Sequence, residues 1–252
     1  MNLSVIVPVW NEAAAIGAFI SHLWARLPDA ELVLVDGGSG DDTWAALQSM
    51  RDPFSLRLLR APRGRAAPMN AGASAASGET LLFLHADSRV PIGCGEAILT
   101  ALADTRCSGG CFRLCFPRPE WIYRVSDSLG NLAVDLFRIG LGDHGIFCRR
   151  KVFDEAGGYP LVPLLEDAEF YRRLGRFGRV RQLPLAVETS PRRYEVHGPY
   201  RTTLFYLFIL MLYLMKVSPH LLARWHRRVM QPAETPRSRL GRWEAAPTAA
   251  FR

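Results

Sequence analysis

Residues 81–88, LLFLHADS, decide the fold. Four apolar residues in a row predict a buried strand, and the polar group His85-Ala86-Asp87 ends that strand abruptly. Ligands of open α/β sheets collect beyond the carboxyl ends of the strands. We therefore expect Asp87 to face a ligand there, and a carboxylate in that position to hold a divalent metal ion.

Strands and helices alternate through the chain that precedes this stretch. Buried strands are predicted at residues 3–9, 32–35 and 56–59, and helical segments at 11–27, 41–50 and within 63–77. Such alternation is typical of right-handed βαβ units and predicts a doubly wound, parallel arrangement for the first 90 residues. Asp36 ends one of these strands, and Trp10 and Glu12 follow another.

The second half of the chain is less regular. We expect a helix over 91–103, a strand near 110–116, a mixed region over 121–137 and a loop that leads into a strand over 142–149. A helix starting at residue 150, a helix over 164–177 and a short strand at 180–183 complete the order. Residues 204–215 are apolar and uncharged. This segment is shorter than the roughly 20 residues that a helix needs to span a bilayer. This segment has three interpretations: a membrane-surface or acceptor-lipid role, a buried core helix, or a true membrane span.

Charge and composition suggest how the chain is divided. The chain is 49% hydrophobic and 22% charged, which is ordinary for a globular protein, and its net charge is +7. Residues 216–252 carry most of that charge, with eight Lys or Arg against two Glu. We expect a catalytic domain over 1–200, an apolar and basic helical segment over 201–230, and a disordered basic tail over 231–252. Basic residues after an apolar segment suit an anionic membrane surface, whereas no basic stripe with interleaved aromatics indicates nucleic acid.

The cysteines favour a reducing compartment. The five cysteines are an odd number, and the first residues lack the basic region of a secretory signal, so we expect a cytoplasmic protein that is peripheral on the inner face of the membrane. Cys107, Cys111 and Cys115 recur every four residues, but the surrounding pattern favours a strand. Buried thiols are therefore predicted, with a metal cluster as the alternative.

The glycine-rich turn GGSGDD is not a dinucleotide fingerprint. It follows the second strand, and the first strand runs into PVWNE rather than into G-x-G-x-x-G. Four segments in this order instead resemble the family 2 glycosyltransferases: SVIVPVWNEA, VLVDGGSGDDT, RAAPMNAGASAASGETLLFLHADS and LLEDAEFYRRL. RGRAAPMNAGA and SPRRYEVHG further resemble a bacterial subgroup of short, uncharacterised members. The resemblance, over about residues 2–190, implies a GT-A fold, which is a doubly wound, nucleotide-binding, Rossmann-like mixed sheet, here followed by a C-terminal apolar helix.

The resemblance implies a nucleotide pocket on the first strands. Pro8, Trp10 and Glu12 would line the nucleotide, and Asp36 would accept a hydrogen bond from the base, although capping of the next helix is the alternative for Asp36. A UDP-sugar is the favoured donor. The resemblance also places Arg65, Asn70, His85, Ala86 and Arg193 at the nucleotide sugar, with an ordinary surface arginine as the alternative for Arg65 and a surface basic turn for Arg193.

The resemblance also implies a metal and a catalytic base. The family usually has Asp-x-Asp where this chain has His85-Ala86-Asp87, so Asp87 would hold Mn²⁺ or Mg²⁺ while His85 is a ribose contact, a ligand or a packed edge residue. Glu166 and Asp167 match the family's acidic pair, with Asp167 as the base of an inverting transfer. The alternative for the pair is two carboxylates that stabilise the start of a helix. Asp143 and His144 fall in a loop that is either acceptor-facing or solvated.

The chemistry predicted is sugar transfer from a nucleoside-diphosphate sugar to an unknown acceptor, lipid-linked or membrane-associated. A nucleotidyltransferase of related fold is one alternative, but it should show a basic, glycine-rich loop after the first strand. A catalytically inactive membrane-bound scaffold is the other, and His85 in place of an acid is its only support.

Overall fold

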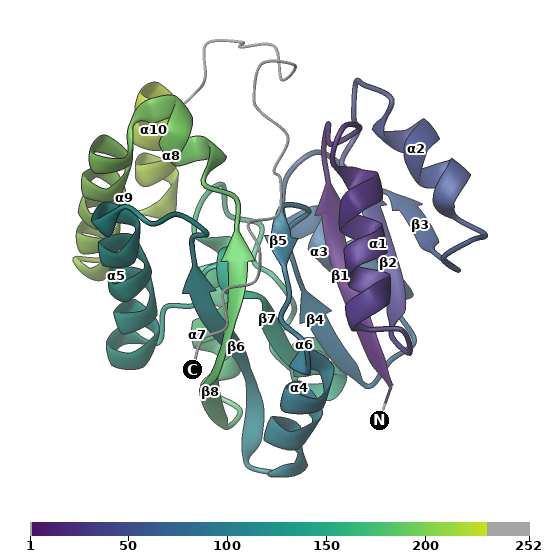
Figure 1. Cartoon of the computed structure of the whole chain (residues 1–252). Coiled ribbons are helices and arrows are strands. Elements are labelled where there is room, and N and C mark those ends of the chain that lie inside the picture. The colour runs from purple at the N-terminus through teal and green to yellow at the C-terminus, as the bar shows by residue number, and fades with distance from the viewer. Residues whose placement is uncertain (1, 231–252) are drawn as a thin grey trace.

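One sheet of eight strands runs through the computed structural model, which describes residues 2–230 (Figure 1). The strand order is β3-β2-β1-β4-β7-β6-β8-β5. The strands are β1 Leu3–Val9, β2 Glu31–Asp36, β3 Arg57–Arg60, β4 Thr80–Phe83, β5 Ser88–Arg89, β6 Cys107–Cys115, β7 Ile146–Arg149 and β8 Arg179–Thr189. β1 pairs in parallel with both β2 and β4, and β2 pairs in parallel with β3, which confirms the doubly wound first half.

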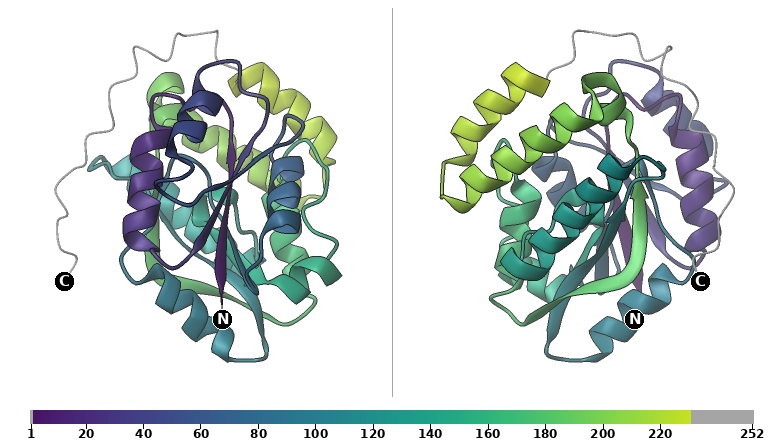
Figure 2. Two further views of the ribbon diagram at one scale, coloured as in Figure 1. Left: turned by 90° about the vertical axis from the view of Figure 1, so that its right-hand side faces the viewer. Right: turned by 60° about the vertical axis from the view of Figure 1, so that its left-hand side comes forward.

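Helices cover both faces of the sheet (Figures 1 and 2). They are α1 Ile16–Arg26, α2 Thr43–Met50, α3 Ala66–Ala75, α4 Cys94–Ala103, α5 Trp121–Phe137, α6 Arg150–Glu155, α7 Glu166–Leu174, α8 Arg192–His197, α9 Pro199–Leu214 and α10 Pro219–Met230, with the short 3₁₀ helix η1 at Gly142–His144. Successive residues of a strand point to opposite faces. Val5 and Val7 therefore join the core under α1, α2 and α4, while Ile6 joins the core under α3, α6 and α7.

The second half makes the sheet mixed, as the GT-A resemblance implies. β7 is antiparallel to β4, β6 is antiparallel to β7, and β8 is parallel to β6. Cys107 and Cys111 lie buried on β6, so the prediction of buried thiols is confirmed for both, whereas Cys115 at the end of β6 is only partly buried. A strand rises about 3.3 Å per residue, which keeps residues four apart from sharing one metal ion.

Three predicted elements have different bounds. The helix expected over 11–27 begins only at Ile16, because Asn11 adopts a φ of 51° and its side chain bonds to the turn after β2. The strand expected at 180–183 extends to Thr189, since it pairs along β6 and then with β5. The mixed region over 121–137 is a single helix, α5, that packs on β6 and α9.

The apolar segment forms α9, which packs back onto the domain beside α5 (Figure 2). Ile209 and Tyr213 are buried against Ala133 of α5 and Ala168 of α7, whereas Leu204 is 66% exposed. Within residues 2–230, no helix has both the length and the apolar character that crossing a bilayer requires, so a true span is not found there. The predicted disordered tail, 231–252, lies outside the described residues.

Candidate active site

The turn after β2 closes over the end of β1. The backbone N–H of Asn11 donates to Ser39 Oγ over 2.8 Å, and the Asn11 side-chain oxygen accepts from Gly40 N over 2.7 Å. Asn tolerates the left-handed conformation that this loop needs better than most residues. Two segments predicted to bind the nucleotide are thereby locked together at the carboxyl edge of the sheet.

Asp36 ends β2 and is 1% exposed. Its carboxylate accepts from Ser39 N over 3.1 Å and from Ser39 Oγ over 2.5 Å, and Arg60 Nε lies 4.0 Å away. A carboxylate has about four acceptor positions, so these bonds leave acceptor capacity for a further N–H.

Trp10 and Glu12 follow β1 at the same edge. The Arg63 guanidinium lies 4.1 Å from the centre of the Trp10 ring, a cation–π contact on the face of the indole. Glu12 Oε1 lies 3.4 Å from a guanidinium nitrogen of Arg192. Pro8 lies just before them in β1, in register with Val35.

His85, Asp87 and Asp143 form a cluster whose ligand atoms all lie within 4.8 Å of one another. His85 and Asp87 follow β4, while η1 supplies Asp143, whose Oδ1 lies 3.0 Å from His85 Nδ1. Burial alone would raise the pKa of Asp143, but His85 holds it well below its usual range. Likewise burial would lower the pKa of His85, and Asp143 raises it.

This cluster fits a divalent cation. His85 Nε2 is buried without a hydrogen-bond partner among the described residues, and the cluster offers one imidazole and two carboxylates. Carboxylate oxygens suit both Mn²⁺ and Mg²⁺, and an imidazole in the set favours a transition metal over Mg²⁺. Asp143 supplies the second carboxylate that the His-Ala-Asp sequence lacks.

Gly142 joins this cluster to the acidic pair. A Cβ at this position would lie 2.3 Å from His85 Nε2 and 2.8 Å from Asp167 Oδ2. Both distances are shorter than van der Waals contact, so the absence of a side chain lets an imidazole and a carboxylate approach from two sides. The metal-type cluster and the acidic pair are thus parts of one site.

Glu166 and Asp167 begin α7, and each is 3% exposed. Leu165 before them has a left-handed φ of 62°, which marks a turn held by its surroundings. Burial and the neighbouring charge of Glu166 raise the pKa of Asp167 to about 6. An acid with that pKa is ionised at neutral pH and still basic enough to accept a proton.

Arg65, just before α3, partly neutralises the negative charge of these acids. Its guanidinium lies 3.6 Å from Glu166 Oε1. Burial opposes the charge of Arg65, but Glu166, Asp167 and Asp143 raise its pKa above the usual value. A permanently charged donor therefore lies beside the acids from the other half of the chain.

The segment from α8 to α10 covers this edge of the sheet (Figure 1). Arg193 donates to the Tyr206 hydroxyl over 2.7 Å, and Asp143 is among the charges that raise the Arg193 pKa. His226 of α10 lies against the Tyr206 ring, and burial and the nearby Arg193 lower the His226 pKa to about 4. Helices that follow the core strands thus contribute to the site.

Not every predicted residue reaches this cluster. The Asn70 amide donates to Tyr159 O over 2.9 Å and accepts from Tyr159 N over 2.8 Å, so its side chain holds the loop after α6. Ala86 is buried between His85 and Asp87, with no polar side-chain atom to offer. His144 is fully buried, so the solvated-loop reading is wrong for it; burial lowers its pKa to about 4.

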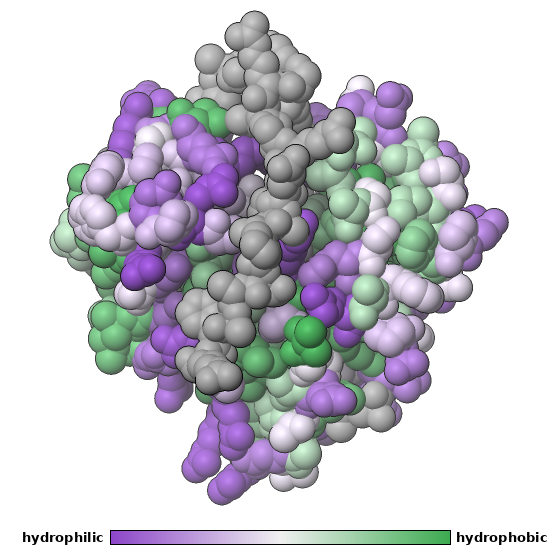
Figure 3. All heavy atoms as spheres, viewed as in Figure 1, coloured by the Kyte–Doolittle hydropathy of each residue, from purple (hydrophilic) through white to green (hydrophobic). Residues whose placement is uncertain are grey.

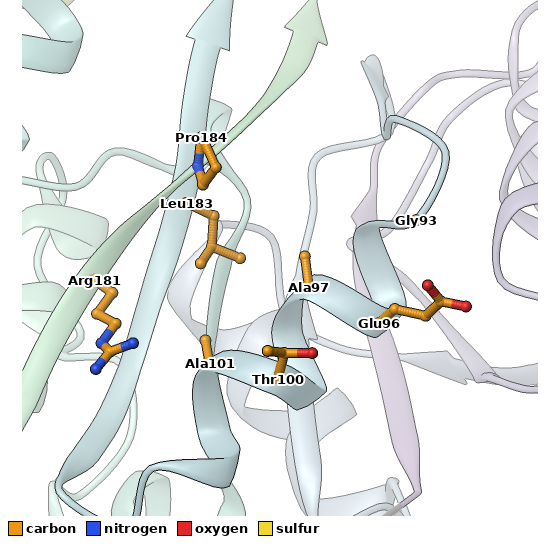
Figure 4. A pocket seen from close by; sticks show the side chains of 8 residues that line it. All are labelled: Gly93, Glu96, Ala97, Thr100, Ala101, Arg181, Leu183 and Pro184. Carbon is orange, nitrogen blue, oxygen red and sulfur yellow. The ribbon is translucent and has the colours of Figure 1, made fainter.

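Sequence reasoning missed Gly142, Tyr206 and His226. Gly142 could have been noticed as the glycine directly before Asp143. Tyr206 and His226 lie in apolar and basic helical patterns that carry no motif. Figure 4 shows a separate pocket of about 400 Å³ between α4 and β8. Its lining includes Glu96, Leu183 and Arg181, and it shares no residue with the cluster described above.

Comparisons with known proteins agree with this geometry. The family model described as "Glycosyl transferase family 2" matches residues 4–157, more than half of the chain. The dodecaprenyl-phosphate galacturonate synthase of Rhizobium johnstonii is 30% identical over 95 residues, which are 34% of this chain and 28% of that protein. The first curated relatives are thus matched over little more than a quarter of their length.

Two solved structures share the fold. The mannosyltransferase PcManGT of Pyrobaculum calidifontis, solved with GDP-Man and Mn²⁺, has a TM-score of 0.61 at 20% identity and covers 89% of this chain and 69% of its own. The glucosyl-3-phosphoglycerate synthase of Mycobacterium tuberculosis, solved with Mn²⁺, UDP and glucosyl-3-phosphoglycerate, has a TM-score of 0.56 at 19% identity over 82% and 78%. The GT-A fold is confirmed, and by its family match the chain belongs to glycosyl transferase family 2.

Proposed function

We propose that the chain is an inverting, metal-dependent glycosyltransferase that takes a sugar from a nucleoside-diphosphate sugar. One observation carries the proposal: the cluster of His85, Asp87 and Asp143 meets the acids of α7 across Gly142. A cation position directly beside a buried base is what sugar transfer needs, since one serves the leaving diphosphate and the other the acceptor. Membership of the family supports the same reaction class.

The nucleotide lies along the ends of β1 and β2 in this proposal. Asp36 accepts the ring N–H beside a carbonyl that uracil and guanine both carry, and Trp10, Pro8 and Glu12 line the nucleoside. Arg65 and Arg193 bring positive charge to the diphosphate, while Asn70 acts through the loop that it holds. A UDP-sugar is the first donor to test; the two similar structures were solved with UDP and with GDP-Man.

Asp87 is the principal metal ligand in this proposal, with Asp143 and His85 completing the set. Mn²⁺ or Mg²⁺ bound there neutralises the charge that develops on the leaving diphosphate. The pairing of His85 with Asp143 orients the imidazole, and His85 would have to give up its second proton before it could hold a cation. His85 favours Mn²⁺ over Mg²⁺.

Asp167 is the base. It takes the proton of the acceptor hydroxyl while the acceptor oxygen bonds to the anomeric carbon. The bond from that carbon to the diphosphate oxygen breaks on the opposite face, and its electron pair leaves with the nucleoside diphosphate, so the configuration inverts. Glu166 raises the basicity of Asp167 and fixes Arg65.

The acceptor is membrane-associated in this proposal. The Rhizobium relative is named for a dodecaprenyl phosphate, and the segment that covers the site is apolar and basic. We accordingly place the enzyme at the inner face of the membrane.

Calorimetry with UDP, GDP and CDP, each with and without Mn²⁺, tests the proposal. We expect one nucleotide to bind and its affinity to fall at least tenfold without the metal. Asp87→Ala should abolish the metal dependence, while the exposed acid variant Asp52→Ala should keep it. Failure of every nucleotide to bind would overturn the proposal and favour a scaffold. A donor screen with membrane lipid extract, read by mass spectrometry, then identifies the sugar and the acceptor.

A further inference from the structure

Helix α5 exposes apolar side chains along one stripe. Trp121 is 60% exposed and Leu136 is 63% exposed, and Val125 and Leu132 lie between them at helical spacing. Large apolar side chains at positions four and seven apart share one face of a helix. Soluble domains seldom leave such a stripe open to water.

Helix α9 carries a second stripe. Its exposed residues recur every three or four positions, which places them on one face: Leu204, Leu207, Phe208, Met211 and Leu214, followed by Met215. The opposite face of α9 is occupied, since Ile209 and Tyr213 enter the core and Tyr206 accepts a hydrogen bond from Arg193. Phe208 of this stripe stacks on Trp225 of α10, with 6.1 Å between the ring centres, yet every residue of the stripe stays at least 41% exposed.

The two stripes form one surface. Ser126 of α5 bonds to Thr203 of α9 over 2.8 Å, and the rings of Trp121 and Tyr200 meet edge to face at 5.6 Å. In Figure 3, hydrophobic side chains gather along the left edge of the molecule, where α5 and α9 lie in Figure 1. We call this surface the α5–α9 face.

The charge around the α5–α9 face is mostly positive. Residues 196–230 contain no Asp or Glu. They contain five basic residues, all exposed: Arg201, Lys216, Arg224, Arg227 and Arg228. On α5, the exposed acids Glu120, at the N-cap, and Asp135 are matched by the exposed Arg124 and Arg138, so the excess positive charge comes from α9, α10 and the turn between them. An apolar face bordered by cations, with an aromatic at its edge, is complementary to the anionic surface of a bilayer.

We infer that the α5–α9 face docks on an anionic lipid bilayer, with its apolar side chains entering the headgroup boundary and the basic residues of α9 and α10 contacting anionic headgroups. The docking surface thus includes α5 as well as the apolar segment of α9. It rests on the membrane association in the proposed function and names the surface responsible for it. Because α9 presents Tyr206 inward to Arg193, docking brings the candidate site close to the lipid that would supply its acceptor.

Vesicle sedimentation with the full chain tests the inference. The vesicles are phosphatidylcholine alone, or phosphatidylcholine with phosphatidylglycerol at about three to one. We expect binding to the mixed vesicles to exceed binding to phosphatidylcholine at least tenfold, and to weaken as salt is raised, since screening shortens the reach of the surface charge.

A pair of double variants locates the surface. Leu136→Gln with Leu204→Gln removes one exposed apolar side chain from each helix, and we expect vesicle binding to fall about tenfold or more. Ile92→Gln with Leu161→Gln changes two comparably exposed residues outside the α5–α9 face and should leave binding unchanged. Thermal melting checks that both proteins fold.

Two outcomes overturn the inference. One is equal vesicle binding by the two double variants. The other is a wild-type dimer that Leu136→Gln with Leu204→Gln converts to a monomer without changing vesicle binding, which would make the face a contact between two copies of the chain. Vesicle binding is measured without nucleotide, so its failure is distinguishable from failure of the calorimetric test of the proposed function.

Discussion

The candidate site has two edges, which are held in place by different forces. The nucleotide edge is formed by the ends of β1 and β2, and the edge around α7 is formed by the acids of α7 with Arg65, His85 and Asp143. At the nucleotide edge, side chains bond to the main chain of a neighbouring turn, as Asp36 does with Ser39 N and Asn11 with Gly40 N. At the edge around α7, side chains from separate segments pair with each other, as in Arg65 with Glu166 and His85 with Asp143. A main-chain bond fixes one side chain at a time, whereas paired charges change one another's pKa. A substitution at the second edge should therefore also affect the groups that pair with the substituted residue.

The largest effect is expected from Asp167→Asn. Loss of a general base should lower the transfer rate by about 10²–10⁴-fold, while the affinity for the donor stays within about twofold, because the nucleotide edge is intact. Measured kcat and calorimetric donor affinity separate the two quantities. Glu169→Gln, on the same helix, is the matched control and should keep the rate. A large loss of donor affinity in Asp167→Asn would contradict the assignment of a base.

Asp87→Ala should act at both edges. Removing the principal metal ligand forfeits several kcal/mol of charge stabilisation, which corresponds to a rate lower by about 10²–10³-fold. Unlike Asp167→Asn, it should also remove the effect of Mn²⁺ on donor binding. Transfer assays and calorimetry at several Mn²⁺ concentrations check this, and a wild-type rate would rule out Asp87 as a ligand.

Gly142→Ala tests the junction between the edges. The added Cβ would lie 2.3 Å from the His85 ring and 2.8 Å from the Asp167 carboxylate, so both side chains must move. A displacement of about 1 Å can cost about 10²-fold in rate, and we expect such a loss with a melting temperature lowered by only a few degrees. Gly157→Ala serves as a stability control, because a Cβ there meets no atom within 4 Å although its φ of 74° is strained for alanine. Equal rates in Gly142→Ala and wild type would show that the junction is loose.

The smallest effect is expected from acid. The pKa of Asp167 is raised to about 6, so the carboxyl is neutral below that pH and cannot accept a proton. Transfer should fall about tenfold per pH unit below 6. Because Glu166 is one cause of the raised pKa, Glu166→Gln should move this limb to lower pH. Profiles of kcat/KM against pH measure both shifts, and an unmoved limb in Glu166→Gln would argue that another group titrates.

The nucleotide edge could be predicted from short stretches of adjacent residues. Asp36 directly follows an apolar run and Asp87 follows one after two residues, so their strand-end positions could be predicted from the pattern. The parallel arrangement of the first four strands followed from the alternation of strands and helices, but their order was not predicted. A strand tip depends on few residues, and those residues are adjacent in the chain.

The edge around α7 could be predicted only in part. Glu166 and Asp167 were found through a motif, but the pairing of Asp143 with His85 joins residues 58 positions apart through packing. Tyr206 reaches Arg193 because α9 folds back on α5, and an apolar repeat does not specify which helix it will meet. Asn70 was predicted at the nucleotide sugar, but its amide bonds to the main chain of Tyr159 instead.

The ion pair between Glu12 and Arg192 has a consequence for the order of folding. It joins residues 180 positions apart, so it forms only after the intervening sheet has brought both ends together. Domains generally fold as units, and the residues proposed to bind the sugar nucleotide include Arg193, after the last strand, as well as residues of the first 90. We therefore expect a growing chain to complete the proposed sugar-nucleotide site only after the helices that cover it have been synthesised. The full chain, rather than its first half, is thus the unit in which transfer is expected.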